Sequence, residues 1–220
     1  MSGDTLQLAL QGDNSVALKV FFILTALSFA PALLISLTSF TRTIIVLSFL
    51  RQALGTQQLP PNQVLVGISL FLTFFVMGPT TDRIYEEAAK PFMDDTIGYE
   101  EAAARAKVPL EEFMLNHTTE EDLRLFYSLA GKDRPLQGDT IPFTVIVPAF
   151  MLSELTTAFR MGLSLFIPML LIDLLVAALL MALGMMMMPP TMVSLPIKIG
   201  IFVLADGWYL VVGSLAGSFF

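Results

Sequence analysis

Four apolar stretches constrain the fold of this chain more than any other feature. They run over residues 16–37, 64–77, 163–188 and 194–215. The third and fourth exceed the roughly 18 to 20 residues that cross the hydrocarbon core of a bilayer, whereas the second is short. Composition agrees, since 55% of the residues are hydrophobic and only 14% are charged. We therefore expect an all-α membrane protein whose four apolar segments form helical hairpins.

Prolines interrupt several of these stretches. Pro31 lies inside the first, Pro168 lies inside the third, and Pro148 precedes the third. A proline inside a helix removes one backbone hydrogen bond and crowds the preceding turn. We therefore expect kinked or broken helices, which persist at membrane depth only where other protein covers the backbone.

The charge is concentrated in one segment. Between Asp82 and Asp139 there are fourteen Asp and Glu residues against seven Lys and Arg, so the whole formal net charge of −7 resides there. This balance excludes a basic surface for nucleic acid. The chain has no cysteine and one histidine, His117, so we expect no metal and no cofactor, and a solvated structural role for His117. No GxxxxGK loop is present, and we expect no enzyme activity.

The loop charges predict the topology. Arg42 and Arg51 place residues 40–62 in the cytoplasm, and the acidic segment 82–145 then lies outside. We divide the chain into an N-terminal helical hairpin at 1–81, an acidic periplasmic helical insert at 82–145, and a C-terminal helical hairpin with a methionine-rich loop at 146–220. The polar residues 1–15 lack a basic region, so we expect no signal peptide in this chain.

The acidic insert shows its own helix signals. Residues 118–121, Thr-Thr-Glu-Glu, fit a capping box before a run of helical spacing that ends at Gly131. A second short amphipathic helix begins at Pro109. We expect these two helices to pair with Phe113 and Phe126 in their core, the alternative being that both aromatics contact a neighbouring subunit.

Five charged residues lie within or next to the apolar stretches: Glu154, Arg160, Asp173, Lys198 and Asp206. Each costs about 2.5 to 3.5 kcal/mol at the centre of a membrane helix and needs protein, water or a partner. Lys198 is expected to meet Glu154 or Asp173, from another segment or from another copy of the chain. The alternative for Lys198 is a side chain that extends to the interface.

The sequence GMMMMPP places four consecutive methionines where a helix must end. Consecutive residues point in all directions around a helix, so core packing alone does not explain the run, although methionine also fills gaps and tolerates lipid. Two following prolines force an extended backbone. If several copies surround an axis, the loops form an apolar constriction that excludes water and deforms around a passing chain. The loop residues are Gly184, Met185, Met186, Met187, Met188, Pro189 and Pro190.

Six stretches of this sequence resemble the FliP family, the export-gate proteins of the bacterial flagellar type III secretion system. They are TSFTRTIIVLSFLRQALGTQQLPPNQVL, LFLTFFVMGP, SELTTAFRMG, FIPMLLIDL, ALGMMMMPP and LPIKIGIFVLADGW. The order GMMMxPP, LPxK and DGW is highly specific. The injectisome homologues of virulence secretion share ALGTQQ and the methionine run, but typically have Ser at the position of Pro189, so the paired prolines favour the flagellar branch.

The resemblance implies an assembly. It implies five copies of this chain with one FliR-like subunit and FliQ-like subunits in a helical, pseudo-hexameric cone, with FlhA-like and FlhB-like components and unfolded secreted substrates as further partners. The expected location is the bacterial inner membrane, in the flagellar basal body, with much of the apolar chain raised to the periplasmic level.

The resemblance also implies residue roles. Met185, Met186 and Met187 form a gasket, and Met188 replaces a more usual Val. By the same likeness Glu154 and Lys198 form intersubunit contacts, and Phe113 and Phe126 pack the periplasmic helices. The expected function is a pore subunit of the flagellar export gate. The alternatives are an injectisome export gate, an ion or small-solute transporter, and a structural scaffold.

Overall fold

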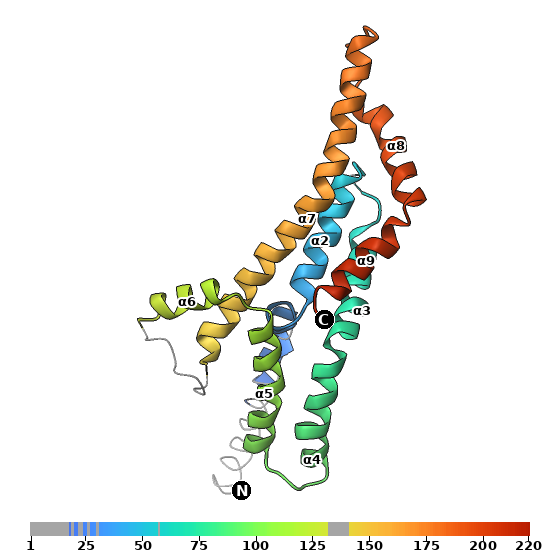
Figure 1. The fold of residues 1–220 in the computed structure, drawn as a ribbon. Helices are drawn as coiled ribbons and strands as arrows, with labels where there is room; N and C mark the ends of the chain where they lie inside the picture. Colours follow the sequence, from blue (N-terminus) through green and yellow to red (C-terminus); the bar gives the residue numbers. More distant parts are fainter. Residues whose placement is uncertain are drawn as a thin grey trace, which may run out of the picture. The chain divides into compact units, whose positions relative to one another are not determined.

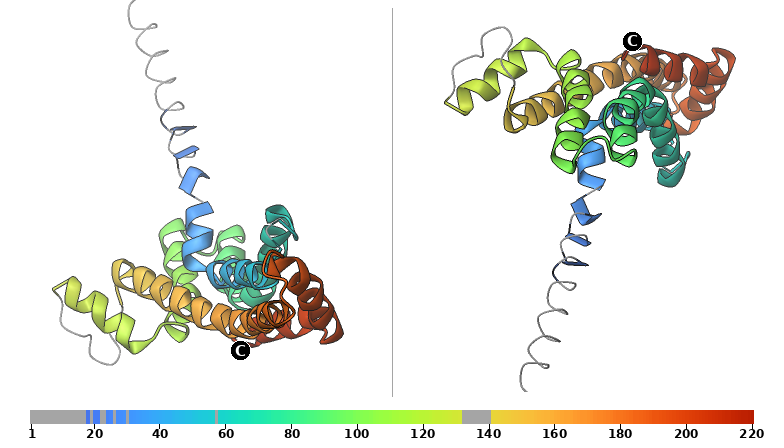
Figure 2. Two further views of the ribbon diagram at one scale, coloured as in Figure 1. Left: turned by 90° about the horizontal axis from the view of Figure 1, so that it is seen from above. Right: turned by 90° about the horizontal axis from the view of Figure 1, so that it is seen from below.

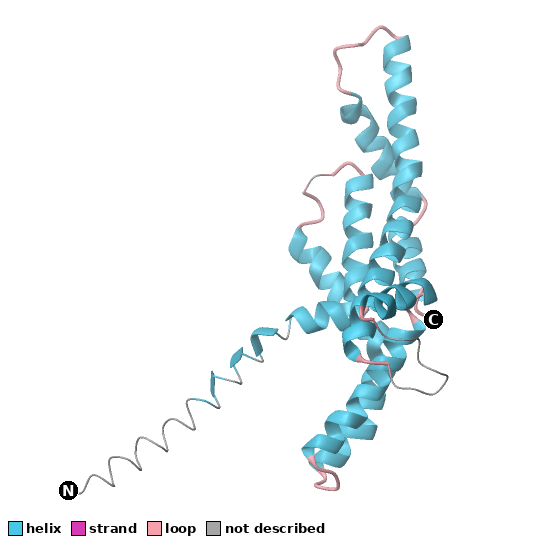
Figure 3. Ribbon diagram, turned by 90° about the vertical axis from the view of Figure 1, so that its left-hand side faces the viewer, coloured by secondary structure: helices cyan, strands magenta, loops and turns pink. Residues whose placement is uncertain are grey.

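The computed structural model describes residues 18–220 except residues 19, 22, 23, 26, 30, 57 and 132–140. Every regular element in this described part is a helix, without any strand (Figure 3). The chain forms two compact units, Met1–Ser36 and Leu37–Phe220. The described residues of the first unit are helical, which agrees with the first apolar stretch, while residues 1–15 and the signal-peptide prediction lie outside the described part.

Helix α2 (Phe40–Ala53) is the best-buried element of the second unit. It packs against α7 along much of its length and also contacts α3 (Figure 1). The charges Arg42 and Arg51 predicted a loop at residues 40–62, and this is wrong for the first fourteen residues of that range, which are helical. The cytoplasmic location of the range stays a prediction. Arg42, which supported the loop, is a buried helix residue.

Helix α3 (Asn62–Ile84) is longer than the apolar stretch 64–77 that predicted it. It continues through a π-helical turn, η1 (Tyr85–Ala89), into α4 (Lys90–Met93), so that the helical run covers 32 residues. The prediction of a short second segment is therefore wrong. The polar residues after Met77 lowered the hydropathy but did not end the helix.

The acidic segment contains α5 (Tyr99–Asn116) and α6 (Glu120–Leu129). The α6 N-cap is Thr119, whose hydroxyl accepts a hydrogen bond from the amide of Asp122 at 3.3 Å. Gly131 follows the helix with φ of +61°, as its predicted capping role requires. The capping prediction is confirmed with a shift of one residue.

The predicted pairing of the two insert helices is wrong. Helix α5 runs through Pro109 instead of beginning there, and it packs on α3, η1 and α7. Helix α6 packs on α7, on the side away from α3 (Figure 2). Both helices therefore contact α7, but only α5 also packs on α3 and η1 among the main contacts of the described part. The division of the chain at residues 82 and 146 stays a prediction.

Helix α7 (Phe143–Ala182) is continuous over 40 residues, including Pro148 and Pro168. Of the kinked or broken helices predicted at these prolines, a break is excluded by the continuous helix, and a kink stays a prediction. The break occurs instead between α8 (Pro190–Leu204) and α9 (Gly207–Gly217), which are bent by 65°. Asp206 stands at this break in the left-handed conformation, with φ of +50°.

Three apolar clusters of described residues stabilise the second unit, the smallest of which comprises Val46, Ala158 and Leu215. The two larger clusters lie at helix junctions. One lies where α3, α5 and α7 meet, and the other joins α2, α3, α8 and α9. The first comprises Val76, Met77, Phe113, Met114, Ile146, Phe150 and Phe219. The second comprises Leu47, Leu50, Leu54, Leu65, Phe202 and Val211.

Two helical runs in the described part are long and apolar enough to cross a membrane. They are Asn62–Met93 and Phe143–Ala182. Two pairs of consecutive helices, Pro31–Leu37 with Phe40–Ala53 and α8 with α9, also qualify if each pair is counted as one span. The fold is that of an all-helical membrane protein with two to four candidate spans.

Candidate functional site

The methionine loop closes the α7–α8 hairpin, at the end of α7 remote from α6 (Figure 1). Helix α7 ends in two backbone hydrogen bonds: the amide of Met185 donates to the carbonyl of Leu180 at 2.9 Å, and the amide of Gly184 donates to Met181 at 3.0 Å. Gly184 has a φ of +74°, which glycine adopts without the strain of a side chain. This is a Schellman ending, and it explains why glycine precedes the methionines.

The other side of the loop is set by prolines. Pro189 is the N-cap of α8 with φ −64° and ψ 121°, and Pro190 is the first helical residue. Proline suits this position because its missing amide would have no partner in the first turn. Between the two helix ends, the amide of Met188 donates to the carbonyl of Met185 at 3.3 Å. Backbone hydrogen bonds and proline geometry thus fix the path of the loop.

The methionine side chains of the loop point away from the rest of the chain. Met186 and Met187 are 80% and 97% exposed, and Met185 and Met188 are each 41% exposed. The adjoining residues Leu183 and Met192 are also largely exposed. One chain therefore presents a continuous apolar tip that it does not cover itself, a feature typical of an interaction or constriction surface.

A buried ion pair joins α2 to α7. Nε of Arg42 donates to Oε2 of Glu154 at 2.9 Å, and Nη2 donates to Oε1. Arg42 is 3% exposed and Glu154 is fully buried. The third guanidinium nitrogen, Nη1, donates to the carbonyl and hydroxyl oxygens of Ser218 at 3.1 and 2.9 Å, and the guanidinium lies 3.9 Å above the Phe219 ring centroid. Two-point pairing and these further partners compensate the desolvation of both charges.

The acidic insert attaches to α7 beside this ion pair. Ser153 accepts a hydrogen bond from the Thr119 amide at 3.0 Å and donates one to the Asp122 carboxylate. The ring nitrogens of His117 lie 2.7 Å from the carbonyl oxygen of Phe113 and 3.3 Å from that of Phe219. His117 thus lies in the predicted turn and has a structural role, but it is half-buried at a junction and not solvated as we predicted.

A second ion pair holds α8. Nζ of Lys198 donates to Oδ2 of Asp173 at 2.6 Å and to the carbonyl oxygen of Ala53 at 3.0 Å. Lys198 is buried, whereas the Asp173 side chain is 35% exposed. Of the two partners expected from the sequence, Lys198 meets Asp173 within the same chain, and Glu154 is occupied by Arg42. Contacts of these charges with another subunit stay a prediction.

The other two predicted charges are not buried in the single chain. Arg160 and Asp206 are both exposed. Asp206 was predicted as a buried charge or an intersubunit contact; it is not buried within one chain, and an intersubunit contact stays a prediction. Its left-handed backbone, which Asp tolerates better than most residues, ends α8.

The two predicted insert aromatics lie in different surroundings. Phe113 is buried and stacks with the Phe219 ring at a centroid separation of 6.4 Å, and it meets the Phe150 ring edge-to-face at 5.9 Å. Phe126 is half-buried on α6. Phe113 does lie in a core, but its partners come from α7 and from Phe219 and not from α6, so the predicted core between the two insert helices is wrong.

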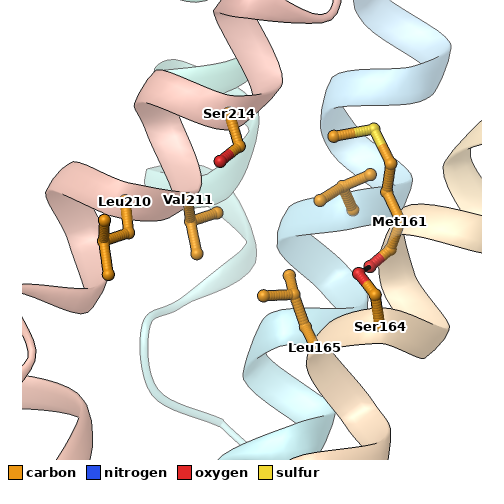
Figure 4. Close-up of a pocket in the computed structure, with 7 residues that line it drawn as sticks. Met161, Ser164, Leu165, Leu210, Val211 and Ser214 are labelled. Atoms are coloured by element: carbon orange, nitrogen blue, oxygen red, sulfur yellow. Dashed lines mark hydrogen bonds between the residues drawn. The ribbon is translucent and has the colours of Figure 1, made fainter.

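A small apolar pocket of about 130 Å³ lies between α2, α7 and α9. Figure 4 shows its lining, including Leu165 opposite Val211, with the hydroxyl of Ser164 donating to the Met161 carbonyl at 2.7 Å. Within the described residues, no group of His, Cys, Asp or Glu could hold a metal ion.

Comparison with known proteins decides the family. The sequence profile of the FliP family matches residues 23–215. The chain belongs to the FliP family. Among curated relatives, the flagellar biosynthetic protein FliP of Bacillus subtilis (strain 168) is 54% identical over 205 residues, which covers 93% of each chain.

Further FliP family relatives come from distant bacteria. The flagellar biosynthetic protein FliP of Pectobacterium carotovorum is 54% identical over 94% of this chain and 80% of the relative. That of Aquifex aeolicus is 48% identical over 95% of this chain and 88% of the relative. The resemblance inferred from the sequence motifs is confirmed, and it places this family member in flagellar biosynthesis.

Proposed function

We propose that this FliP family member is the core pore subunit of the flagellar type III protein export gate, and that it conducts unfolded flagellar substrates. The observation that carries the proposal is the methionine loop. Its four side chains are 41% to 97% exposed at the tip of a hairpin whose backbone is fixed on both sides. An apolar surface on a fixed support suits a seal.

Methionine is well suited to such a seal. Its unbranched thioether side chain has three rotatable bonds and adapts to irregular surfaces. A ring of these side chains is a hydrophobic constriction, which blocks water and ions by dewetting. The same flexibility lets the ring yield to an unfolded chain and close behind it. Met185, Met186, Met187 and Met188 form this gasket, with Gly184, Pro189 and Pro190 setting its backbone.

The length of α7 supports a position partly above the bilayer. Its 40 residues extend over about 60 Å at 1.5 Å per residue, which is about twice the hydrocarbon thickness. Part of this apolar helix must then lie outside the lipid and be covered by protein. We place the assembled gate in the bacterial inner membrane at the flagellar basal body, with much of it at the periplasmic level.

Assembly with other subunits supplies that cover. Helix α3 exposes three large aromatics, and α7 exposes an apolar row at helical spacing. The proposed partners are four further copies of this chain, one FliR-like subunit, FliQ-like subunits, and FlhA-like and FlhB-like components, arranged around a cone. The exposed residues are Phe71, Phe74 and Phe75 on α3, and Leu163, Ile167, Leu170, Leu174 and Leu175 on α7.

The flagellar role is favoured over the alternatives. The relatives from Bacillus, Pectobacterium and Aquifex are all flagellar biosynthetic proteins, which favours this system over an injectisome. A small-solute transporter would need a polar substrate site near the bilayer midplane. The buried charges Arg42 and Lys198 are instead occupied by partners within the chain. We propose no catalysis by this subunit, so that energy for export comes from other components.

Leak and export measurements test the proposal. Two sets of cells, both with the full export apparatus, are compared: one carries the natural chain, and in the other Met185 to Met188 are replaced by glycine. The native mass of the purified complex verifies that it is assembled in both. We expect ion leakage through the intact complex to rise. Met93→Gly is the matched control, because Met93 is also exposed, at 61%, but lies on α4. An intact glycine variant that leaks no more than the control contradicts the proposed seal.

A further inference from the structure

The methionines of this chain differ greatly in exposure. Met114 is 0% exposed and Met77 is 4% exposed, whereas Met186 and Met187 are 80% and 97% exposed. Oxidation of methionine to its sulfoxide converts a flexible apolar side chain into a polar one, and oxidants reach exposed sulfur more readily than buried sulfur. The most accessible thioethers of the described chain thus lie side by side in the methionine loop.

We propose that Met186 and Met187 are an oxidation site, and that their conversion to methionine sulfoxide opens the seal. The claim that oxidation opens the seal rests on the proposed function, since it requires these side chains to line the constriction. The first half of the proposal, selective oxidation, is argued from the exposure of the loop in the single chain. The loop is then a redox-sensitive element within the gate.

The chemistry balances with hydrogen peroxide as the oxidant. A lone pair on the methionine sulfur attacks one peroxide oxygen, an S–O bond forms and the O–O bond breaks. The leaving hydroxide takes the proton of the transferred oxygen and departs as water. The sulfur is oxidised by two electrons and the peroxide is reduced by two. Peroxide is small enough to reach a constriction that excludes folded protein.

The loop can keep its backbone path while its surface changes. The bonds that close it join backbone atoms, namely those from Met185 to Leu180, from Gly184 to Met181 and from Met188 to Met185. None of these bonds needs the thioether sulfur. A sulfoxide oxygen is a hydrogen-bond acceptor that favours water, so an oxidised ring loses the apolar character on which dewetting depends.

Mass spectrometry tests the site itself. The assembled complex is treated briefly with peroxide, digested, and sulfoxide is quantified at each methionine. We expect Met186 and Met187 to be oxidised at least about tenfold faster than Met77 and Met114 in the same sample. Equal rates for the four residues overturn the proposal, whatever the role of the loop.

Leakage tests the consequence. Cells carrying the intact complex should lose the seal after peroxide, and the two classes of methionine sulfoxide reductase together should restore it. A variant with Met185 to Met188 replaced by leucine should show the same leak before and after peroxide, whereas Met93→Leu should respond like the natural chain. Oxidation at Met186 and Met187 without leak overturns the switch. If the glycine variant of this loop also fails to leak, the proposed function itself is wrong.

Discussion

Glu154 binds Arg42, a residue 112 positions earlier in the sequence, through both carboxylate oxygens in a site almost closed to solvent. The pair joins α2 to α7, and the same guanidinium holds Ser218. The acidic insert attaches at the neighbouring residue Ser153. At this ion pair α2, α7, the chain end at Ser218 and the acidic insert meet.

Removing one partner of this pair should be costly. Glu154→Gln leaves the buried Arg42 without its counter-charge, and we expect a loss of about 3 to 5 kcal/mol in the free energy of unfolding. The double replacement Arg42→Met with Glu154→Leu should lose much less, because no buried charge then remains. Unfolding of the detergent-solubilised chain measures both. A double variant as unstable as the single one contradicts this explanation.

The ion pair between Lys198 and Asp173 predicts that replacing the lysine destabilises the chain more than replacing the aspartate. Lys198→Met removes the only ammonium that bonds both Asp173 and the Ala53 carbonyl in the described structure, and we expect about 1 to 3 kcal/mol of destabilisation. Asp173→Asn should cost less, because this side chain is 35% exposed and an amide oxygen still accepts a bond. Hydrogen exchange of α8 should rise more in the lysine variant; the opposite order argues against the ranking.

Two glycines in the C-terminal hairpin predict opposite outcomes. A Cβ atom at Gly207 would lie 2.2 Å from the Phe202 ring, so Gly207→Ala should destabilise the chain by about 1 to 3 kcal/mol. Gly213→Ala meets no atom within 4 Å and should stabilise α9 by about 0.5 to 1 kcal/mol. Thermal unfolding compares the two. Equal stability of both variants contradicts the contact at Phe202.

Acid should weaken the attachment of α5 to α3. Arg83 donates a hydrogen bond to Glu112 and lowers the pKa of that carboxyl below its ordinary value of 4.5. The folded state therefore gains stability from this pair above pH 4.5 and loses it as the pH falls through the lower pKa. Glu112→Gln should unfold at a slightly lower temperature than the natural chain at about pH 7. The difference in unfolding temperature between the two chains should vanish at acidic pH. A difference that stays the same at all pH values shows that the Arg83–Glu112 pair does not cause it.

Much of the helical framework could be predicted from the sequence because it depends on local properties. The apolar stretches predict the long helices, the threonine and glycine signals predict the ends of α6, and GMMMMPP predicts the loop between α7 and α8. Each signal depends on residues within a few turns of one another. The position of the loop therefore follows from its own residues, whereas its role in sealing stays a prediction.

The burial of α2 could not be predicted in this way. From local sequence Arg42 is indistinguishable from a charge in a loop. Its burial depends on pairing with Glu154, which is more than half the chain away in sequence. The hydrogen bonds of His117 likewise involve Phe219, 102 residues away. Pro148 and Pro168 also did not mark a helix break, because α7 is continuous across both. Long helices with many other hydrogen bonds tolerate the loss of one.

Crosslinking tests the central claim most directly, because the chain has no cysteine of its own. The claim is that the methionine loop lines the path of exported chains. Met187→Cys is introduced into the full export apparatus together with a stalled substrate that carries one cysteine, and Met93→Cys serves as the exposed control. We predict a disulfide-linked adduct of subunit and substrate at position 187 and none at position 93. With the complex intact and the substrate stalled, absence of the adduct at position 187 would contradict the claim.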